Sequence, residues 1–187
     1  MAKIGVLLAE GLEEVECLAV VDMLRRGSQQ VEMLSVMGEK TITGSHGIGI
    51  VCDGLLEEAK GDWDLLFLPG GIPGVPNLEN NPRVREAVKA QAAAGKYVAA
   101  ICAAPMILGH LGLLDGKTFT CYPGCEKEFD GKNGARWSGA PWEQDGKILT
   151  GRGVGVAIDF GLKLLAVLAG EEAAESVKSS IQHPERI

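Results

Sequence analysis

Cys102 stands between a segment typical of a buried strand and the start of a helix. Residues 97–101 read Tyr-Val-Ala-Ala-Ile, and Pro105 favours the first turn of the helix. A cysteine at such a turn lies near unpaired backbone amides and the positive end of a helix, which both favour its thiolate form. The pattern therefore indicates a nucleophile, but a structural cysteine packed among its alanine neighbours is an equally good interpretation.

Glu16 differs from the other acids of the N-terminal segment. At the helical positions four before it and three and four after it are only apolar residues, Leu12, Ala19 and Val20. A carboxyl on the apolar side of a helix is expected to have a raised pKa and to donate or accept a proton. The alternative is a solvated acid that interacts with the start of the helix.

Two glycine-rich turns follow apolar segments. Gly70 and Gly71 end a buried run, where backbone amides could approach a ligand closely and form an oxyanion hole, although a plain turn explains them too. Residues 151–155, Gly-Arg-Gly-Val-Gly, resemble an anion cradle that includes Arg152. Val156 occupies the place of the last glycine in the dinucleotide-binding motif, so no nucleotide cofactor is expected.

The histidines do not predict a metal site. None of His46, His110 and His183 has the spacing of a metal ligand to another ligand, and Cys121 with Cys125 is too small a set to indicate zinc. His46 lies in a glycine-rich turn from which it could reach a site. We therefore expect neither a metal nor an organic cofactor.

The composition limits the class of protein. The 187 residues are 46% hydrophobic and 23% charged, as expected for one globular domain over residues 1–187. The net charge of −7 argues against a stable nucleic-acid or anionic-membrane partner. The apolar run at residues 4–9 is too short for a signal peptide or a membrane span, and the five cysteines indicate free thiols in a reducing cytoplasm.

Apolar runs of strand length alternate with helical patterns along the chain. Strands are predicted at residues 3–8, 31–36, 65–68, 97–101, 118–121 and 147–150, with a hairpin at 41–52. Helices are predicted at residues 12–26, 82–94 and 105–111, and a long one from 156 onward; residues 124–142 read as irregular. This order predicts an α/β fold with a mostly parallel sheet, helices on both faces, and a ligand site beyond the carboxyl ends of the strands.

Four segments at these strand ends, in the same order over nearly the whole chain, resemble the ThiJ/PfpI superfamily. Within it they are similar to the parkinsonism-associated deglycase branch and the bacterial proteins close to it. The segments are Glu13-Glu-Val-Glu16 with Asp22-Met-Leu-Arg-Arg-Gly27, Leu68-Pro-Gly-Gly71, Ala99-Ala-Ile-Cys-Ala-Ala-Pro105, and Leu149-Thr-Gly-Arg-Gly-Val-Gly155 with Asp159-Phe160.

The resemblance implies a flavodoxin-like three-layer sandwich that forms a homodimer through its first helix. Cys102 would be the nucleophile or an oxidisable thiol, hydrogen-bonded to Glu16, and the backbone amides of Gly71 and Ala103 would form an anion pocket. Two positions depart from relatives. Ala103 stands where peptidase-like members have a histidine, and Tyr122 where some deglycase-branch members have one. His46 aligns with a dimer-interface position of relatives.

These observations lead to a first hypothesis and two alternatives. The first is a cofactor-independent cysteine enzyme of the deglycase or glyoxalase III type, which acts on α-oxoaldehydes such as methylglyoxal and glyoxal or on their early glycated adducts. The second is a redox-responsive stress or chaperone protein in which oxidation of Cys102 is the functional event. The third is a small-substrate cysteine hydrolase, which Ala103 disfavours because the histidine base is missing.

Overall fold

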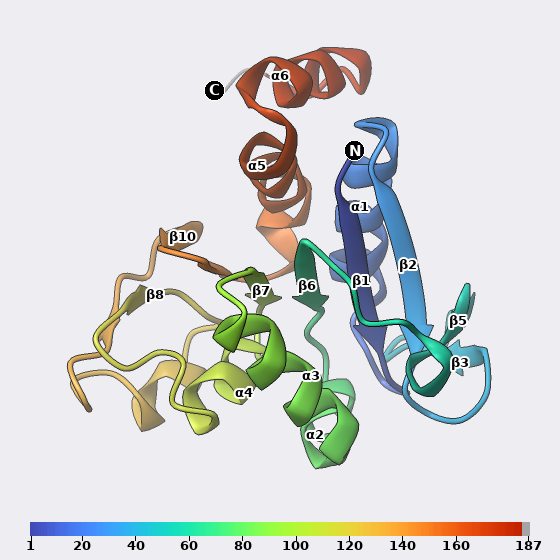
Figure 1. Cartoon of the computed structure of the whole chain (residues 1–187). Helices are drawn as coiled ribbons and strands as arrows, with labels where there is room; N and C mark the ends of the chain where they lie inside the picture. Colours follow the sequence, from blue (N-terminus) through green and yellow to red (C-terminus); the bar gives the residue numbers. More distant parts are fainter. Residues whose placement is uncertain (185–187) are drawn as a thin grey trace.

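A seven-stranded sheet forms the centre of the structure, a computed structural model that describes residues 1–184 (Figure 1). The strand order is β10-β11-β7-β6-β1-β2-β5, and all neighbours run parallel except β10 and β11. The strands are β1 (Lys3–Leu8), β2 (Gln30–Ser35), β5 (Gly54–Leu55), β6 (Leu65–Leu68), β7 (Tyr97–Ile101), β10 (Trp142–Asp145) and β11 (Ile148–Gly151).

Helices cover both faces of this sheet, because its central strands are apolar on both sides. In β1, Leu7 packs into the core on one face and Leu8 into the core on the other. One layer contains α1 (Glu14–Arg26) and α5 (Ala157–Ala169); the other contains α2 (Gly74–Asn80), α3 (Pro82–Ala93) and α4 (Pro105–His110). The predicted three-layer, flavodoxin-like α/β fold is confirmed.

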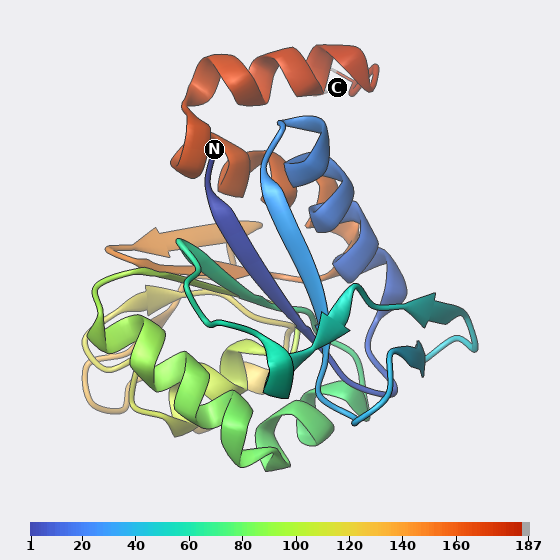
Figure 2. The same cartoon turned by 45° about the vertical axis from the view of Figure 1, so that its right-hand side comes forward.

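Smaller elements complete the chain. The predicted hairpin is present as β3 (Thr41–Thr43) and β4 (Gly49–Val51), which project beside the start of α1 (Figure 2). A separate two-stranded sheet pairs β8 (Thr118–Phe119) with β9 (Arg136–Trp137). Short 3₁₀ helices are η1 (Leu56–Glu58), η2 (Cys125–Glu128) and η3 (Val154–Val156).

Several predicted boundaries are wrong for identifiable reasons. The single closing helix is two helices, α5 and α6 (Glu171–Ser180), because Gly170 between them has a φ of 92° that ends the first. The sequence analysis missed α2, since its Gly-Val-Pro start reads as a turn, whereas a proline in the first helical turn is tolerated. It also missed the edge strand β10, and the strand predicted at 118–121 is only β8.

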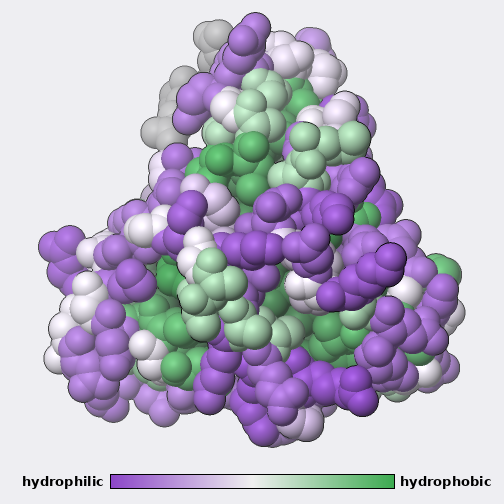
Figure 3. Space-filling model, in the orientation of Figure 1, coloured by the Kyte–Doolittle hydropathy of each residue, from purple (hydrophilic) through white to green (hydrophobic). Residues whose placement is uncertain are grey.

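The surface of the face in Figure 3 is mostly hydrophilic, with hydrophobic side chains visible in hollows between the polar ones. Within residues 1–184, no helix combines the length and the apolar character that crossing a bilayer requires.

The parallel topology brings the carboxyl ends of β1, β6, β7 and β11 to one edge of the sheet. The segments that follow these strand ends are therefore neighbours in space.

His110, at the end of α4, connects η2, which follows β8, to α2 and α4. Its two ring nitrogens contact carboxylates on both sides, Glu79 of α2 and Glu128 of η2, the latter at 3.1 Å. Its ring also packs edge-on against Phe129, with ring centroids 5.0 Å apart. Burial alone would lower the pKa of His110, but the two carboxylates raise it above the ordinary value. The imidazolium form therefore holds η2 against α4.

We expect His110→Gln to lower the free energy of unfolding by about 1 kcal/mol at pH 6, the upper range for partly exposed ion pairs. The loss should shrink at pH 9. Because the folded-state pKa of His110 is raised, its contribution is complete below the unfolded-state pKa of about 6.5 and disappears as the pH rises through the folded-state value. Urea denaturation at both pH values measures this, and equal losses would contradict the ion-pair interpretation.

Candidate active site

Cys102 occupies a strained turn directly after β7. Its φ of 64° lies in the left-handed region, which costs a residue with a side chain about 1–3 kcal/mol. Hydrogen bonds on both sides hold it there: its amide donates to the carbonyl of Gly151 at 2.9 Å, and its carbonyl accepts from the amide of Tyr122 at 2.8 Å. The turn directs the Cys102 side chain toward the Gly70-Gly71 segment.

Gly70 and Gly71 allow the loop after β6 to approach the cysteine. A Cβ at Gly70 would lie 2.5 Å from Oε2 of Glu16 and 2.6 Å from Cβ of Cys102. Gly71 has a φ of 98°, and a Cβ there would lie 2.2 Å from the amide nitrogen of Glu13. No other residue fits either position without moving the site.

Glu16 is fully buried on the first turn of α1, next to Cys102. Its Oε2 accepts a hydrogen bond from the amide of Gly70 at 3.0 Å, whereas its Oε1 is buried without a hydrogen-bond partner in normal bonding geometry. Glu13 caps the helix, its carboxylate accepting from the Glu16 amide at 2.6 Å. The unpartnered oxygen is available to a proton or to a bound molecule.

The two side chains share an environment that disfavours negative charge. Burial raises the pKa of Glu16 to about 7, and the charge of Glu13 adds to this rise, while contact with the Cys102 thiol opposes it. Burial also raises the pKa of Cys102, and so does the neighbouring Glu16 carboxylate. The backbone amides of Ala103 and Gly71 lower it by hydrogen bonding to the sulfur.

The sequence-based expectation that the turn by itself favours the thiolate is therefore corrected. The α4 helix has only six residues, so its dipole is small, and burial together with the Glu16 charge outweighs the amides. When Glu16 holds the proton, the repulsion between the two charges is removed, and the pKa of the Cys102 thiol falls relative to its value beside the carboxylate, while burial still raises it. Near neutral pH, the pair can pass one proton between sulfur and carboxyl.

Tyr122 and Gly153 border the same carboxyl. A Cβ at Gly153 would lie 3.6 Å from Cδ2 of Tyr122 and 4.0 Å from Oε1 of Glu16, so the aromatic ring and this oxygen both lie close to the glycine. The backbone amide of Val154 also faces the Glu16 carboxyl. Arg152 is exposed on this loop, and its amide donates to the carbonyl of Pro141 at 2.9 Å.

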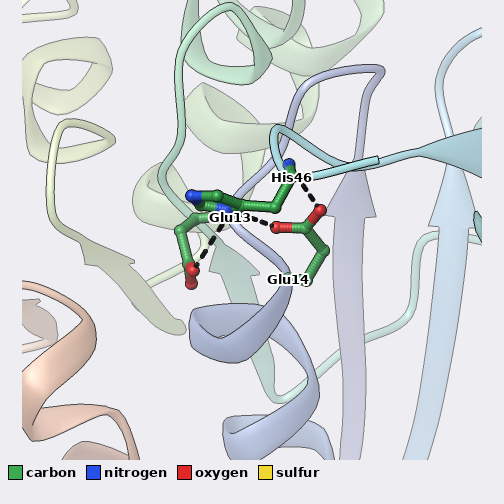
Figure 4. Close-up of side chains that lie close together, drawn as sticks. All are labelled: Glu13, Glu14 and His46. Atoms are coloured by element: carbon green, nitrogen blue, oxygen red, sulfur yellow. Dashed lines mark hydrogen bonds and ion pairs between the residues drawn. The ribbon is translucent and has the colours of Figure 1, made fainter. Parts of the chain in front are cut away.

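His46 lies beside Glu13 and Glu14 (Figure 4). Its Nδ1 is 2.8 Å from Oε2 of Glu14, and its amide donates to Oε1 of Glu14 at 2.7 Å. Although Glu14 is buried, which raises its pKa, the hydrogen bonds from His46 and Ile48 hold that pKa at about 2. An ionised Glu14 thus fixes the hairpin loop to α1.

One group within residues 1–184 has spacing compatible with a metal ion, namely Glu13, Glu14 and His46, whose ligand atoms lie within 4.8 Å of one another. The Glu13 carboxylate accepts a hydrogen bond from the Glu16 amide, and the Glu14 carboxylate is hydrogen-bonded to His46. These bonds explain why the carboxylates lie together without requiring a metal ion. The sequence did not single out Glu13 or Glu14 as residues that support the site. The spacing of Glu13 three residues before Glu16, typical of a helix cap, is the signal that could have found the first.

A family model described as the DJ-1/PfpI family matches residues 2–167. The chain belongs to this family. The predicted resemblance is therefore confirmed.

Relatives in the DJ-1/PfpI family match nearly the full length of the chain. The Parkinson disease protein 7 homolog of Danio rerio is 35% identical over 178 residues, which cover 94% of each chain. The glutathione-independent glyoxalase DJR-1.2 of Caenorhabditis elegans is 30% identical over 169 residues, which cover 90% of this chain and 89% of that one. The structure of oxidized DJ-1 from Toxoplasma gondii has a TM-score of 0.93 at 30% identity and covers 99% of this chain and 100% of that chain.

The protonation of Glu16 should control the reactivity of Cys102. We expect the rate of Cys102 alkylation by iodoacetamide to show an inflection near pH 7 in the wild type, because ionised Glu16 accepts the thiol proton. Glu16→Gln should lack this inflection. Peptide mass spectrometry over pH 5–10 measures the rate at Cys102 alone.

Glu13→Gln is the matched control for this experiment. The amide retains an acceptor for the helix cap and removes the charge that raises the pKa of Glu16, so the inflection should move to lower pH. An inflection that persists unchanged in Glu16→Gln would assign the titration to another group.

Proposed function

We propose that this DJ-1/PfpI protein is a cofactor-independent cysteine enzyme that converts α-oxoaldehydes, such as methylglyoxal and glyoxal, or their early adducts with thiols and amines, to 2-hydroxy acids. The observation that carries the proposal is the contact between the Cys102 thiol and a buried Glu16 carboxyl whose pKa is about 7. The name of the Caenorhabditis elegans relative, a glutathione-independent glyoxalase, supports it.

In the first step, the sulfur of Cys102 attacks the aldehyde carbon. The thiol proton passes to Glu16, and Glu16 then donates a proton to the aldehyde oxygen. This oxygen thereby becomes the hydroxyl of a hemithioacetal. The amides of Gly71 and Ala103, which point at the sulfur, are positioned to stabilise its thiolate and an oxyanion formed beside it. The carbon–sulfur bond forms and the carbonyl π bond breaks, with no net oxidation.

In the second step, Glu16 moves a proton between the two carbons of the adduct. Its carboxylate removes the hydrogen of the sulfur-bearing carbon and returns a proton to the neighbouring carbon. The hydroxyl proton of the hemithioacetal passes to the neighbouring carbonyl oxygen, so that the product is a thioester of a 2-hydroxy acid. Water then cleaves the thioester, releasing the 2-hydroxy acid and restoring the thiol. One aldehyde and one water give one acid, so no cofactor is consumed.

The same site favours a second function, in which oxidation of Cys102 is the regulatory event. Two peroxide molecules would convert the thiol to a sulfinic acid and release two waters. A protonated Glu16 and the amides of Gly71 and Ala103 are suited to hydrogen-bond the new oxygens. The similar structure from Toxoplasma gondii is that of an oxidized DJ-1, which supports this second function.

Purified protein should convert methylglyoxal to lactate without glutathione. Cys102→Ala should abolish this turnover, and Glu16→Gln should lower kcat about 100-fold, a typical value for loss of a general acid–base. Cys125→Ala, which removes a half-buried thiol of η2, is the matched control and should keep the wild-type rate. Chromatographic measurement of lactate and substrate follows the reaction.

Equal turnover by Cys102→Ala would overturn the enzymatic proposal. Absence of turnover, together with selective gain of two oxygens at Cys102 in mild peroxide and protection of client proteins from aggregation, would favour the redox function. Oxidation spread over all five cysteines would contradict the redox function.

We further propose that the protein is a cytoplasmic homodimer. Large apolar side chains are exposed on α1, Val15 and Leu18, and on the adjacent hairpin, Ile48 and Val51. The hydrogen bond from the Ile48 amide to Glu14 holds the hairpin beside α1. We propose that these side chains together contact the second copy. The five free cysteines are consistent with a reducing compartment.

Ile48→Asp should convert the dimer to a monomer, because a second copy would bury the new carboxylate in an apolar interface. Light scattering during size-exclusion chromatography distinguishes the two masses. Met37→Asp, at an exposed apolar residue that follows β2, is the control expected to leave the dimer intact. A monomeric wild type would overturn the proposed assembly.

A further inference from the structure

Large apolar side chains are exposed on three segments next to the Cys102 site. Ile72 is 64% exposed, Tyr122 is 56% exposed and Val154 is 48% exposed. Each is linked to the reacting pair by a backbone contact: Ile72 follows the Gly71 amide that bonds to the sulfur, the Tyr122 amide bonds to the carbonyl of Cys102, and the Val154 amide faces the Glu16 carboxyl. Such exposed apolar groups beside a reactive thiol are available to contact a substrate.

The ring of Tyr122 has a defined place in this site. A Cβ of Gly153 would lie 3.6 Å from Cδ2 of Tyr122 and 4.0 Å from Oε1 of Glu16, so the ring and this buried oxygen both lie close to Gly153. Because Gly153 has no side chain, it leaves the space near both groups open. Its φ of 162° is extended backbone, so this glycine is not required by conformation.

The direction of a bound adduct follows from this arrangement. Proton transfer by Glu16 needs both reacting carbons near Oε1, and the first carbon is bonded to the sulfur of Cys102. Because the Tyr122 ring and Oε1 both lie within 4 Å of one point at Gly153, a substituent on the second carbon is within reach of the Tyr122 ring. A methyl group there covers little of the ring, whereas an aryl group can pack against it in an offset or edge-on geometry and bury a larger apolar area.

We infer that the site prefers α-oxoaldehydes with an aryl or similarly bulky apolar substituent, and that Tyr122 is the residue that selects them. This inference rests on the proposed function and specifies its substrate class. Tyr122 acts through its aromatic face rather than its hydroxyl.

The test compares kcat/KM for phenylglyoxal and methylglyoxal in the wild type, Tyr122→Ser and Tyr122→Phe. The ratio of phenylglyoxal to methylglyoxal should fall about tenfold in Tyr122→Ser, as expected for loss of one apolar wall. It should stay within about twofold of the wild-type ratio in Tyr122→Phe, because the ring is retained. Using a ratio removes any common effect of the substitution on Cys102.

Either of two outcomes would overturn the inference. An unchanged ratio in Tyr122→Ser would show that the ring does not contact the substituent. An equal fall in Tyr122→Phe would assign the selection to the hydroxyl. Turnover of both aldehydes with an unchanged ratio would reject this inference alone, whereas absence of turnover of both by the wild type would reject the proposed function.

A second measurement does not depend on turnover. The rates at which N-phenylmaleimide and N-ethylmaleimide alkylate Cys102, followed by peptide mass spectrometry, report whether an aryl group is bound beside the thiol. The ratio of the two rates should fall several-fold in Tyr122→Ser and be retained in Tyr122→Phe. A ratio that is the same in all three proteins would contradict an aryl-binding wall even if no aldehyde is converted.

Discussion

A fully buried carboxyl in contact with a thiol is the interaction on which the rest of this site depends. Taking Glu16 out of water raises its pKa to about 7, and its charge in turn raises the pKa of Cys102. Neither group alone is a strong acid or nucleophile at neutral pH. Together they hold a proton that can move between them, which suits both addition to an aldehyde and stabilisation of an oxidised sulfur.

This contact requires the backbone to come unusually close. The left-handed turn at Cys102 brings the thiol out of β7, and the absence of side chains at Gly70 and Gly71 lets the neighbouring strand end approach it. Glu13 caps α1 through the amide of Glu16, so the helix that carries the acid starts at the site. The sheet supplies the rigid frame, since β1, β6, β7 and β11 end at the same edge.

The DJ-1/PfpI family model matches residues 2–167, and the thiol, the acid and the amides of the candidate site all lie within that range. Ala103, which follows Cys102, has no acid–base group, and the ring of Tyr122 lies near the acid. In the proposed mechanism, proton transfer therefore falls to Glu16. The polar interactions of His46 serve a different purpose, because they fix the hairpin loop through ionised Glu14.

The sequence by itself determined the alternation of strands and helices, the family, and Cys102 and Glu16 as candidates, because hydrophobic periodicity and short motifs are local properties of the chain. It did not reveal α2 or β10, which are short elements with weak local patterns, or the break at Gly170, which depends on the backbone conformation of one residue. Only the tertiary structure decided the direction of the Cys102 pKa shift and the place of Tyr122. Both depend on burial and on contacts between residues far apart in the chain, which no local pattern encodes.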